Sequence, residues 1–521
     1  MDTFRKLFRG QVDGLNAGIS LVDDRKLWVK ILVLCLPAIV FACVLRWLLI
    51  HSMPEAFFGS DTNSYFGTVI DWHENGRWRD EVKRRWVYPY FMGMVSCLPG
   101  SPAVWISVIQ HTVMVVATPF LGWIIWHVTG GSSWSVLAGT LAWAGWPKAL
   151  RYGQEALPEV FCLVAFVVSI AMVLPCGAAR NWKARFLSLL CLALLVGLKP
   201  HGRGLWLGVV IAIGLWAGWR VWRWGAASIF ALTLGIAAMV SSGSARQGNW
   251  LLLSSALPLV PLEGRVASEA REILRPVIER ARGYGWNYPL RQSEFKKPLA
   301  EKNPEEAVSP EWAAYIKKDK EGAYDAMGVL AKEGVMSNPV KWCAFSAIKV
   351  LISSEGTINW VWFDPKNYWD DMDSSFRPKH EGDDLIKRYY FGVAPEDWSV
   401  LVKERSHRTS PVAAWVRIAS PHYAWVSMAS GKDQDIKSLF LGMNAILGLA
   451  VIGISIMPVM CGWRVALLVC LPVFFYCMTV FGIGDSLQRY LFPVEWLGWI
   501  TVLLPCARLM RIISARVVSR R

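Results

Sequence analysis

The chain lacks the short signatures that mark the common nucleotide-driven and hydrolytic enzymes. Its 521 residues contain no GxxxxGK[ST] phosphate loop, no GxGxxG fingerprint, no HExxH zinc helix and no GxSxG elbow. The 11 cysteines form no Cys-x-x-Cys pair and stand mostly inside apolar runs, where they act as small hydrophobic residues. Internal repeats and low-complexity tracts are also absent from the sequence. These absences argue against a nucleotide-driven pump and the common hydrolases.

Long apolar runs stand in place of those motifs. Hydrophobic residues make up 54% of the chain, which includes 30 tryptophans, and its mean hydropathy is +0.33. Runs of about 18–20 apolar residues predict membrane-spanning helices. The formal net charge of +15 comes largely from bases in short turns and at both termini, which is typical of topology signals on the cytoplasmic side. The sequence therefore predicts an integral membrane protein that meets phosphate-bearing membrane lipid and binds no nucleic acid.

The runs predict an all-α polytopic membrane protein of about ten transmembrane helices with a mixed or helical extracytoplasmic domain. The expected spans are about 28–50, 103–126, 133–147, 157–175, one that ends near 197, 204–219, 225–243, 437–458, 464–481 and 490–507. They divide the chain into a transmembrane module at 1–243 with an outer loop at 51–102, an extracytoplasmic domain at 244–435, and C-terminal helices with a basic tail at 436–521. With this division, the short basic turns all fall on the cytoplasmic side.

The outer loop after the first span holds the densest group of polar side chains. Asp61 and Tyr65 begin it, and Arg85 and Tyr88 close it. An acid kept at a membrane surface is costly unless it has a partner or a task, so we interpret Asp61 as a general base that takes a proton from an acceptor. The alternative is structural, since Asp is also favoured as the N-cap of the helix that is expected over 65–78.

Two acids follow in the next predicted outer link. Glu155 and Glu159 are four residues apart, which would place them on one helical face, where they could bind an acceptor or a divalent cation together. The alternative for Glu159 is a favourable position in the first turn of a helix, next to the positive end of the helix dipole.

Basic groups are expected at two further outer positions. Lys199, His201 and Arg203 stand at a helix mouth, and Arg489 with Tyr490 precedes the last span. Strong bases suit the phosphate of a lipid carrier. In the alternative interpretation, these side chains only anchor helix ends at the membrane interface.

Taken in order, these motifs resemble those of the GT-C glycosyltransferases, and in particular protein O-mannosyltransferases, lipid A aminoarabinose transferases and rhizobial lipopolysaccharide galacturonosyltransferases. The matching positions are Asp61-x-x-x-Tyr65, Gly76, Tyr88-Pro89, Leu157-Pro158-Glu159, Gly197-Leu198 with Arg203, Asn338-Pro339, and Arg489-Tyr490 with Pro493. Two features depart from the pattern. Thr62 follows Asp61 where the mannosyltransferases carry an Asp-Glu pair, and the large polar domain comes before only three final spans.

The resemblance implies an inverting enzyme that transfers a sugar from a polyprenyl-phosphate donor to a lipid, glycan or protein acceptor, with Asp61 as the catalytic acid of the family. It also implies a multi-pass protein of the bacterial inner membrane whose active site faces the periplasm. It requires no nucleotide sugar and leaves a divalent cation open. Two other functions stay open: a polymerase or ligase of lipid-linked glycans, and a transporter or lipid flippase.

Overall fold

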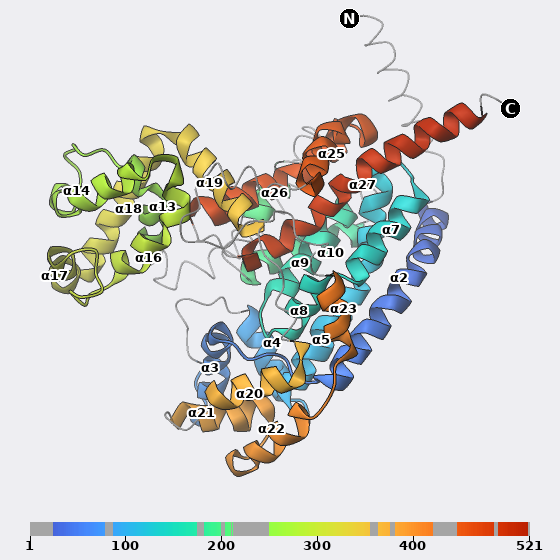
Figure 1. The fold of residues 1–521 in the computed structure, drawn as a ribbon, viewed down its shortest axis with the longest axis horizontal. Helices are drawn as coiled ribbons and strands as arrows, with labels where there is room; N and C mark the ends of the chain where they lie inside the picture. The colour runs from blue at the N-terminus through green and yellow to red at the C-terminus, as the bar shows by residue number, and fades with distance from the viewer. Residues whose placement is uncertain are drawn as a thin grey trace, which may run out of the picture.

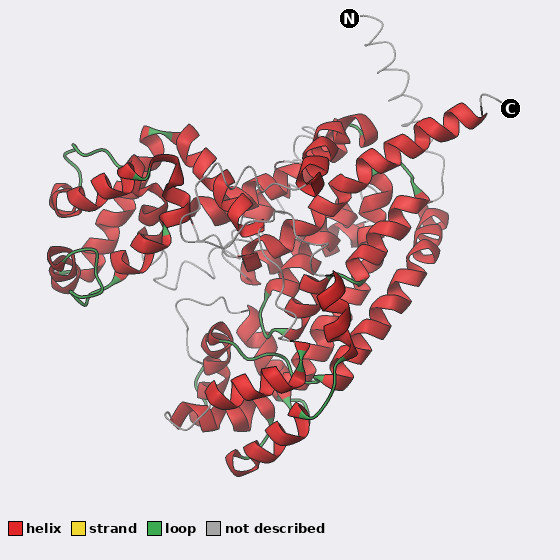
Figure 2. Ribbon diagram, viewed as in Figure 1, coloured by secondary structure: helices red, strands yellow, loops and turns green. Residues whose placement is uncertain are grey.

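The fold is helical throughout the part of the chain that the computed structural model describes. The described residues are 24–78, 87–174, 182–198, 204–209, 211, 249–354, 363–375, 381–419, 445–483 and 488–518. The structure is 84% helical, and these residues form no β-strand, only one isolated bridge between Phe57 and Glu155 (Figure 2). The prediction of an all-α protein is confirmed for this part of the chain.

The helices of the first half follow the predicted apolar runs. They are α2 (Asp24–Ser52), α3 (Ser60–Asn75), α4 (Val87–Ser96), α5 (Pro102–Val116), α6 (Thr118–Val128), α7 (Ser133–Ala144), α8 (Pro147–Gln154), α9 (Glu159–Val173) and α10 (Trp182–Leu198). The run predicted as one span at 103–126 is two helices, α5 and α6, which meet at a turn at Ala117 just before Thr118 and Pro119. The predicted span at 225–243 and most of that at 204–219 lie outside the described residues.

The second half holds many short helices and then three long ones. They are α13 (Asn249–Ala256), η3 (Leu257–Leu259), α14 (Ser268–Gly283), η4 (Gly285–Asn287), α15 (Tyr288–Arg291), α16 (Ser293–Ala300), α17 (Pro310–Lys318), α18 (Lys320–Ser337), α19 (Pro339–Ser354), α20 (Pro365–Ser375), α21 (Glu381–Ile386), η6 (Lys387–Phe391), η7 (Pro395–Asp397), α22 (Trp398–Ser406), α23 (Pro411–Ala419), α25 (Ala445–Cys461), α26 (Trp463–Ile483) and α27 (Gln488–Val518).

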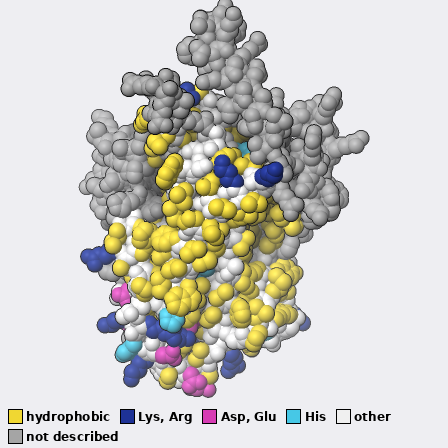
Figure 3. Space-filling model, turned by 90° about the vertical axis from the view of Figure 1, so that its right-hand side faces the viewer, with side chains coloured by type: hydrophobic (Ala, Val, Ile, Leu, Met, Phe, Trp, Pro, Cys, Tyr) yellow, Lys and Arg dark blue, Asp and Glu magenta, His cyan; other side chains and the backbone are white. Residues whose placement is uncertain are grey.

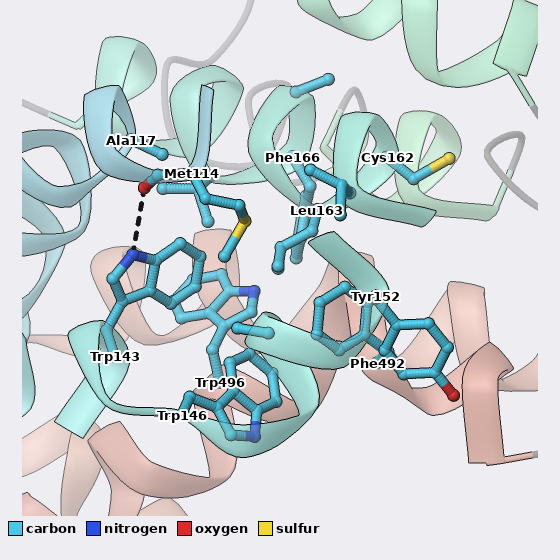
Figure 4. Packing of buried hydrophobic residues seen from close by; sticks show 14 of the residues in the cluster. Met114, Ala117, Trp143, Trp146, Tyr152, Cys162, Leu163, Phe166, Phe492 and Trp496 are labelled. Atoms are coloured by element: carbon cyan, nitrogen blue, oxygen red, sulfur yellow. Dashed lines mark hydrogen bonds between the residues drawn. The ribbon is translucent and has the colours of Figure 1, made fainter. Parts of the chain in front are cut away.

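The larger of two main hydrophobic cores joins the first half of the chain to the last helices. Trp146 packs against Phe492 of α27 with ring centroids 4.9 Å apart, and Tyr152 packs against the same ring at 4.5 Å (Figure 4). The indole N–H of Trp143 donates to the backbone oxygen of Met114 at 3.3 Å, so this buried polar group is satisfied. The aromatic side chains of this core therefore hold α27 against α7, α8 and α9.

The second core lies within residues 249–354. Its members come from α13 to α19, and Trp312 at its centre is fully buried and donates to the backbone oxygen of Leu299 at 2.8 Å. In Figure 1 this group of helices stands at the left, away from α2, and α19 connects it to the long helices through contacts with α26 and α27. The apolar stretch at 340–352 belongs to α19, which packs on two of the predicted spans.

The large buried hydrophobic residues of 363–375 and 381–419 belong to the first core and not to the second. Tyr368, Trp369, Phe391 and Trp398 of this segment are buried in the same cluster as residues of α2, α3 and α5. Within the predicted domain at 244–435, the described residues therefore divide between two separate cores. Rings of the later segment pack on the outer loop, as Tyr368 does on Phe57 and Tyr390 on Phe58, with centroids 4.4 and 4.9 Å apart.

Two stretches of the described chain are long and apolar enough to cross a membrane, Lys26–Ser52 and Pro102–Val128. Helices of this kind also occur in the cores of soluble proteins and in signal sequences, so the prediction of about ten spans is not confirmed. The first stretch is mostly exposed: only 22% of its most apolar 18-residue segment is buried inside the protein. Its open face carries Val29, Val33, Leu36, Val40, Val44 and Trp47 at helical spacing.

This face is part of a wider apolar surface. Figure 3 looks at the side of the molecule that carries α2 and shows hydrophobic side chains over a broad band, with the acidic side chains of this view gathered below it. An exposed apolar patch of this extent marks a membrane or a protein contact. The band therefore gives weak support to a membrane protein.

A charge in the middle of the exposed face of α2 should distinguish membrane contact from water contact. Val40→Lys places an ammonium group near the centre of the stretch, which costs about 2.5–3.5 kcal/mol of insertion free energy if that face meets lipid. We expect a clear loss of the variant from carbonate-washed membranes. Val266→Lys is the matched control, because Val266 is exposed to 54% and Val40 to 55%. Equal membrane recovery of the two variants would contradict lipid contact at α2.

Candidate functional site

The segment that ends α8 is paired with the loop that ends α2. Glu155 has extended backbone angles and ends the helix, and the bridge to Phe57 follows directly. The backbone N–H of Phe57 donates to the oxygen of Gln154 at 2.5 Å, and that of Ala156 donates to the oxygen of Phe57 at 3.1 Å. These two bonds place the start of the outer loop beside residues 154–156.

One buried amide side chain fixes this pairing. Gln154 is fully buried, and its amide nitrogen donates to the backbone oxygens of Met53 and Glu55, both at 2.7 Å. Its oxygen accepts from Ser107 Oγ at 3.1 Å and lies 2.9 Å from His111 Nε2. A single side chain thus satisfies two carbonyls of the loop and two polar groups of α5.

A second buried amide, Gln110 on α5, makes similar bonds to the same stretch of chain. Gln110 of α5 donates to the backbone oxygens of Gly153 and Glu155 at 3.0 and 2.7 Å, and accepts from the hydroxyl of Tyr88 at 2.9 Å. Gln110 and Tyr88 are both fully buried. The stretch 153–155 therefore holds the start of the outer loop directly, and it holds Tyr88 of the same loop through Gln110.

Asp61 lies inside the first turn of α3 and not at its cap. The N-cap is Gly59, whose N–H donates to Thr62 Oγ1 at 3.1 Å, and the Thr62 hydroxyl in turn donates to the backbone oxygen of Ala156 at 3.3 Å. The capping alternative for Asp61 is therefore wrong, and the helix expected over 65–78 covers Ser60–Asn75. Thr62 thus joins the first turn of α3, which holds the half-buried Asp61, to the chain between the two glutamates.

Two tyrosines connect Asp61 to Glu159. Asp61 and Tyr65 are four residues apart and share one face of α3. The buried ring of Tyr65 packs edge-on against Tyr88, with centroids 5.3 Å apart. Burial raises the pKa of Tyr88 well above its usual value, and the nearby Tyr390, Glu159 and Tyr65 raise it further. Tyr88 therefore stays protonated as a hydrogen-bond donor, and Glu159 lies within its electrostatic reach.

The two glutamates are close in the chain but do not share a helical face. Glu155 ends α8, whereas Glu159 begins α9, so the expectation that they lie on one helix is wrong. Glu155 accepts from Arg151 Nε at 2.7 Å, while Glu159 is 1% exposed. Burial raises the pKa of Tyr152 well above its usual value, and Glu155, Glu159 and Glu495 add to this effect. All three carboxylates are thus near enough to Tyr152 to act on the pKa of its hydroxyl.

Glu495 brings the last long helix into the site. Lys148 Nζ lies 2.7 and 2.8 Å from the two carboxylate oxygens of Glu495, and both side chains are almost fully buried. Removing one partner of such a pair would leave a buried charge without compensation. The pair therefore fixes α27 to α8, which carries Arg151 and leads into Glu155.

Residues 363–419 cover the outer loop from the other side. Tyr390 donates its hydroxyl proton to the backbone oxygen of Ala56 at 3.0 Å, and the hydroxyl of Tyr368 accepts from the N–H of Phe58 at 3.3 Å. The side chain of Arg405 binds Glu55 at 2.9 Å. These contacts join residues more than 300 positions apart, and they fix the loop directly before Asp61.

Several predicted site residues lie outside what the structure describes. Arg85, Lys199, His201 and Arg203 are among the residues left undescribed. Arg489 and Tyr490 belong to the first turn of α27, although their side chains are not described. Among the described residues, no three His, Cys, Asp or Glu side chains are grouped as metal ligands. Of the predicted set, the structure brings Tyr65 and Tyr88 into contact, and the bond from Thr62 to Ala156 joins the helix of Asp61 to the chain between Glu155 and Glu159.

Sequence reasoning missed the polar residues that hold this set in place. Gln110 and His111 interrupt an apolar run, and Glu495 stands two residues after Pro493 inside another. Polar residues inside a predicted membrane span are a functional signal by default. That signal was available for these three, whereas nothing local marks Gln154 as the partner of Met53 and Glu55.

Truncation of Gln154 should destabilise the site more than truncation of a comparable glutamine. Gln154→Ala leaves two buried carbonyls of the loop without donors, at a cost of about 1–3 kcal/mol each. We expect a clearly lower unfolding temperature in detergent and faster hydrogen exchange over residues 53–58. The control is Gln292→Ala, since Gln292 is also buried but bonds to the Ser254 hydroxyl, which can turn to another partner. Equal losses in the two variants would contradict a special role for Gln154.

The Glu55–Arg405 pair should make stability depend on pH. Burial raises the pKa of Glu55, and the charge of Arg405 only partly opposes this effect. The folded state therefore holds the Glu55 proton more tightly than the unfolded state, so stability falls as pH rises from the usual carboxyl value through the raised pKa. Glu55→Gln should remove this fall, which thermal unfolding measured across mildly acidic to neutral pH can detect.

Glu404→Gln is the control for this experiment. Glu404 also contacts Arg405, at 2.7 Å, but its side chain is 60% exposed. An exposed pair contributes roughly 0–1 kcal/mol, so the pH dependence should stay as in the parent protein. A pH profile of Glu55→Gln that matches the parent would show that Glu55 does not titrate in this window.

No protein-family model, no curated protein and no solved structure matches this chain. What supports a function for the site is therefore the chemistry and arrangement of its own residues.

Proposed function

We propose that the chain is an integral-membrane glycosyltransferase of the GT-C type. It moves a sugar from a polyprenyl-phosphate donor to a lipid, glycan or protein acceptor, with Asp61 as the general base. The observation that carries the proposal is the bond from Thr62, which follows Asp61, to Ala156, which stands between Glu155 and Glu159 in the chain, together with the Tyr65–Tyr88 contact. Acids brought together with buried tyrosines suit the deprotonation and orientation of an acceptor hydroxyl.

The reaction needs one base and one leaving group. The acceptor oxygen attacks the anomeric carbon from the side opposite the phosphate, and its proton passes to the Asp61 carboxylate. The bond between the anomeric carbon and the phosphate oxygen breaks, and the electron pair leaves with the polyprenyl phosphate. One displacement of this kind inverts the anomeric configuration. Because the donor carries its own activated phosphate, no nucleotide sugar is consumed.

The surroundings of Asp61 are consistent with the role of a base. Its position in the first turn of α3 places the carboxylate at the positive end of the helix dipole, which favours its charged form. Its helix is held by the bond from Thr62 to Ala156 and by the packing of Phe66 on Tyr390, with ring centroids 5.0 Å apart, which would position the carboxylate before substrate binds. Such preorganisation is what a general base within hydrogen-bond reach of its proton requires.

Bases from two other chain segments would hold the donor phosphate. Arg489 stands in the first turn of α27, the same helix whose Glu495 pairs with Lys148 beside the site. Lys199, His201 and Arg203 follow α10, which packs against α9 behind Glu159. A guanidinium group matches a phosphate in geometry and charge. In this proposal the protein crosses the bacterial inner membrane several times, and the site faces the periplasm.

Substitution of Asp61 should separate chemistry from stability. Asp61→Asn keeps size and helix position but cannot take a proton, so sugar transfer from a polyprenyl-phosphate donor should fall by roughly 10²–10⁴-fold. Because Gly59 is the N-cap, Asp61→Ala should cost no more than about 1 kcal/mol of stability through the lost dipole interaction. Turnover by mass spectrometry and unfolding temperature check the two effects.

Asp370→Asn is the matched control, since Asp370 is an exposed carboxylate on α20 of the covering segment. Its turnover should equal that of the parent protein. Near-parental transfer by Asp61→Asn would remove Asp61 from the mechanism and leave Glu155 and Glu159 as the remaining candidates.

A further inference from the structure

The far end of α3 carries a second polar site. A hollow of about 560 Å³ opens there and is lined by Asp71, Asn75, Arg77 and Trp78. This volume lies within the range of roughly 300–1,000 Å³ that is typical of small-molecule sites. These four residues lie away from Asp61. Asp71, the nearest of them in the chain, is ten helical positions after Asp61, a distance of ~15 Å along the helix axis.

The local sequence explains how these four residues come together. Asp71 and Asn75 are four residues apart on α3 and share one face. Gly76 then ends the helix in the left-handed region, with φ 61° and its N–H bonded to the oxygen of Trp72 at 3.0 Å. This conformation favours glycine, and it turns the chain so that Arg77 and Trp78 follow beside the helix end.

The opposite face of α3 is occupied by contacts within the protein. His73 Nε2 lies 2.9 Å from Ser96 Oγ, and its ring stacks on Tyr389 with centroids 5.1 Å apart. The hydroxyl of Tyr389 also donates to the carboxylate of Glu74. The end of α3 is therefore fixed by α4 and η6.

The aromatic wall of the hollow is held in place. Trp78 stacks on Tyr90 with centroids 4.4 Å apart and an interplanar angle of 15°, and Trp72 lies 6.2 Å from it. A Cβ added at Gly93 would lie 3.1 Å from the Trp78 ring, so the ring rests directly on α4. Trp78 is half-buried and Trp72 is exposed to 37%, so both can also meet a ligand.

We infer that this hollow binds a pyranose ring of the acceptor, which makes the acceptor a glycan or a glycosylated lipid. A sugar ring has an apolar face that packs on an indole and a rim of hydroxyls. A carboxylate, an amide and a guanidinium group can bond to that rim as acceptors and donors. The assignment to the acceptor rests on the proposed function. One ring cannot reach both Asp71 and Asp61, so the sugar in the hollow is distinct from the one that is transferred.

Direct binding of simple sugars tests this site without any reaction. The probe is a panel of methyl hexopyranosides, neutral ones and uronides, added to the full-length protein in lipid nanodiscs that are free of sugar detergents. Saturation-transfer NMR should detect binding of at least one pyranoside. Asp71→Asn should weaken that binding by about tenfold, as expected for one charge-assisted hydrogen bond, and Trp78→Ala should weaken it as well.

Two control variants lie elsewhere on the surface. Trp286→Ala removes a tryptophan that is 54% exposed in the 249–354 group, and Asp370→Ala removes an exposed carboxylate. Neither should change the binding. Absence of binding by every pyranoside, or unchanged binding in both Asp71→Asn and Trp78→Ala, would overturn the inference.

The outcome is separate from that of the Asp61 experiment. Asp61→Asn should bind the pyranoside as the parent protein does. Lost transfer in Asp61→Asn together with no sugar binding by the parent would reject only the hollow as a sugar site. Sugar binding together with full transfer by Asp61→Asn would reject only the proposed mechanism.

Discussion

The hydrogen bonds of the Gln154 side chain are the constraint on which the candidate site depends. They join the end of α8 to the loop after α2 and to α5, three segments that no local interaction would bring together. Inside a protein such bonds are strong, and an unmade one is costly, so a fully satisfied amide selects one arrangement of its neighbours. The start of α3, and with it Asp61, follows from this arrangement through Thr62 and Ala156.

Charged pairs and aromatic rings add the remaining parts of the chain to this centre. The buried pair of Lys148 and Glu495 attaches α27, and the pair of Glu55 and Arg405 attaches the segment before α23. A buried pair rarely adds much stability, because desolvation offsets the attraction between its charges. Such a pair instead fixes the position of its two segments, because moving either segment away would leave the other partner as a buried charge without compensation. Stability comes instead from the rings that surround these pairs.

The two hydrophobic cores have separate consequences for function. The core formed by 249–354 contributes none of the groups around Asp61, whereas residues 363–419 touch the loop directly. Helix α3 carries Asp61 in its first turn, and Asp71 and Asn75 of the hollow near its end. A site for reaction and a site for recognition on one helix would suit an extended acceptor.

The sequence by itself determined the helices and some of their ends. Long apolar runs predict α2, α9 and α26, because backbone hydrogen bonds within a helix depend only on neighbours along the chain. Helix ends are equally local: Ser309 and Asp319 accept from the first turns of α17 and α18. The acids and tyrosines of the outer loop were visible in the same way, as polar residues between apolar segments.

The tertiary structure alone decided which of these residues meet. Lys148 and Glu495 are 347 positions apart, and Tyr390 reaches Ala56 across 334. Spacing along the chain carries no information about such pairs, since they depend on how large rings and buried amides pack together. The same reason explains the cap of α3. Asp61 is a favoured capping residue, but the cap is at Gly59 and Asp61 lies inside the first turn, while the neighbouring Thr62 bonds to Ala156, 94 positions away.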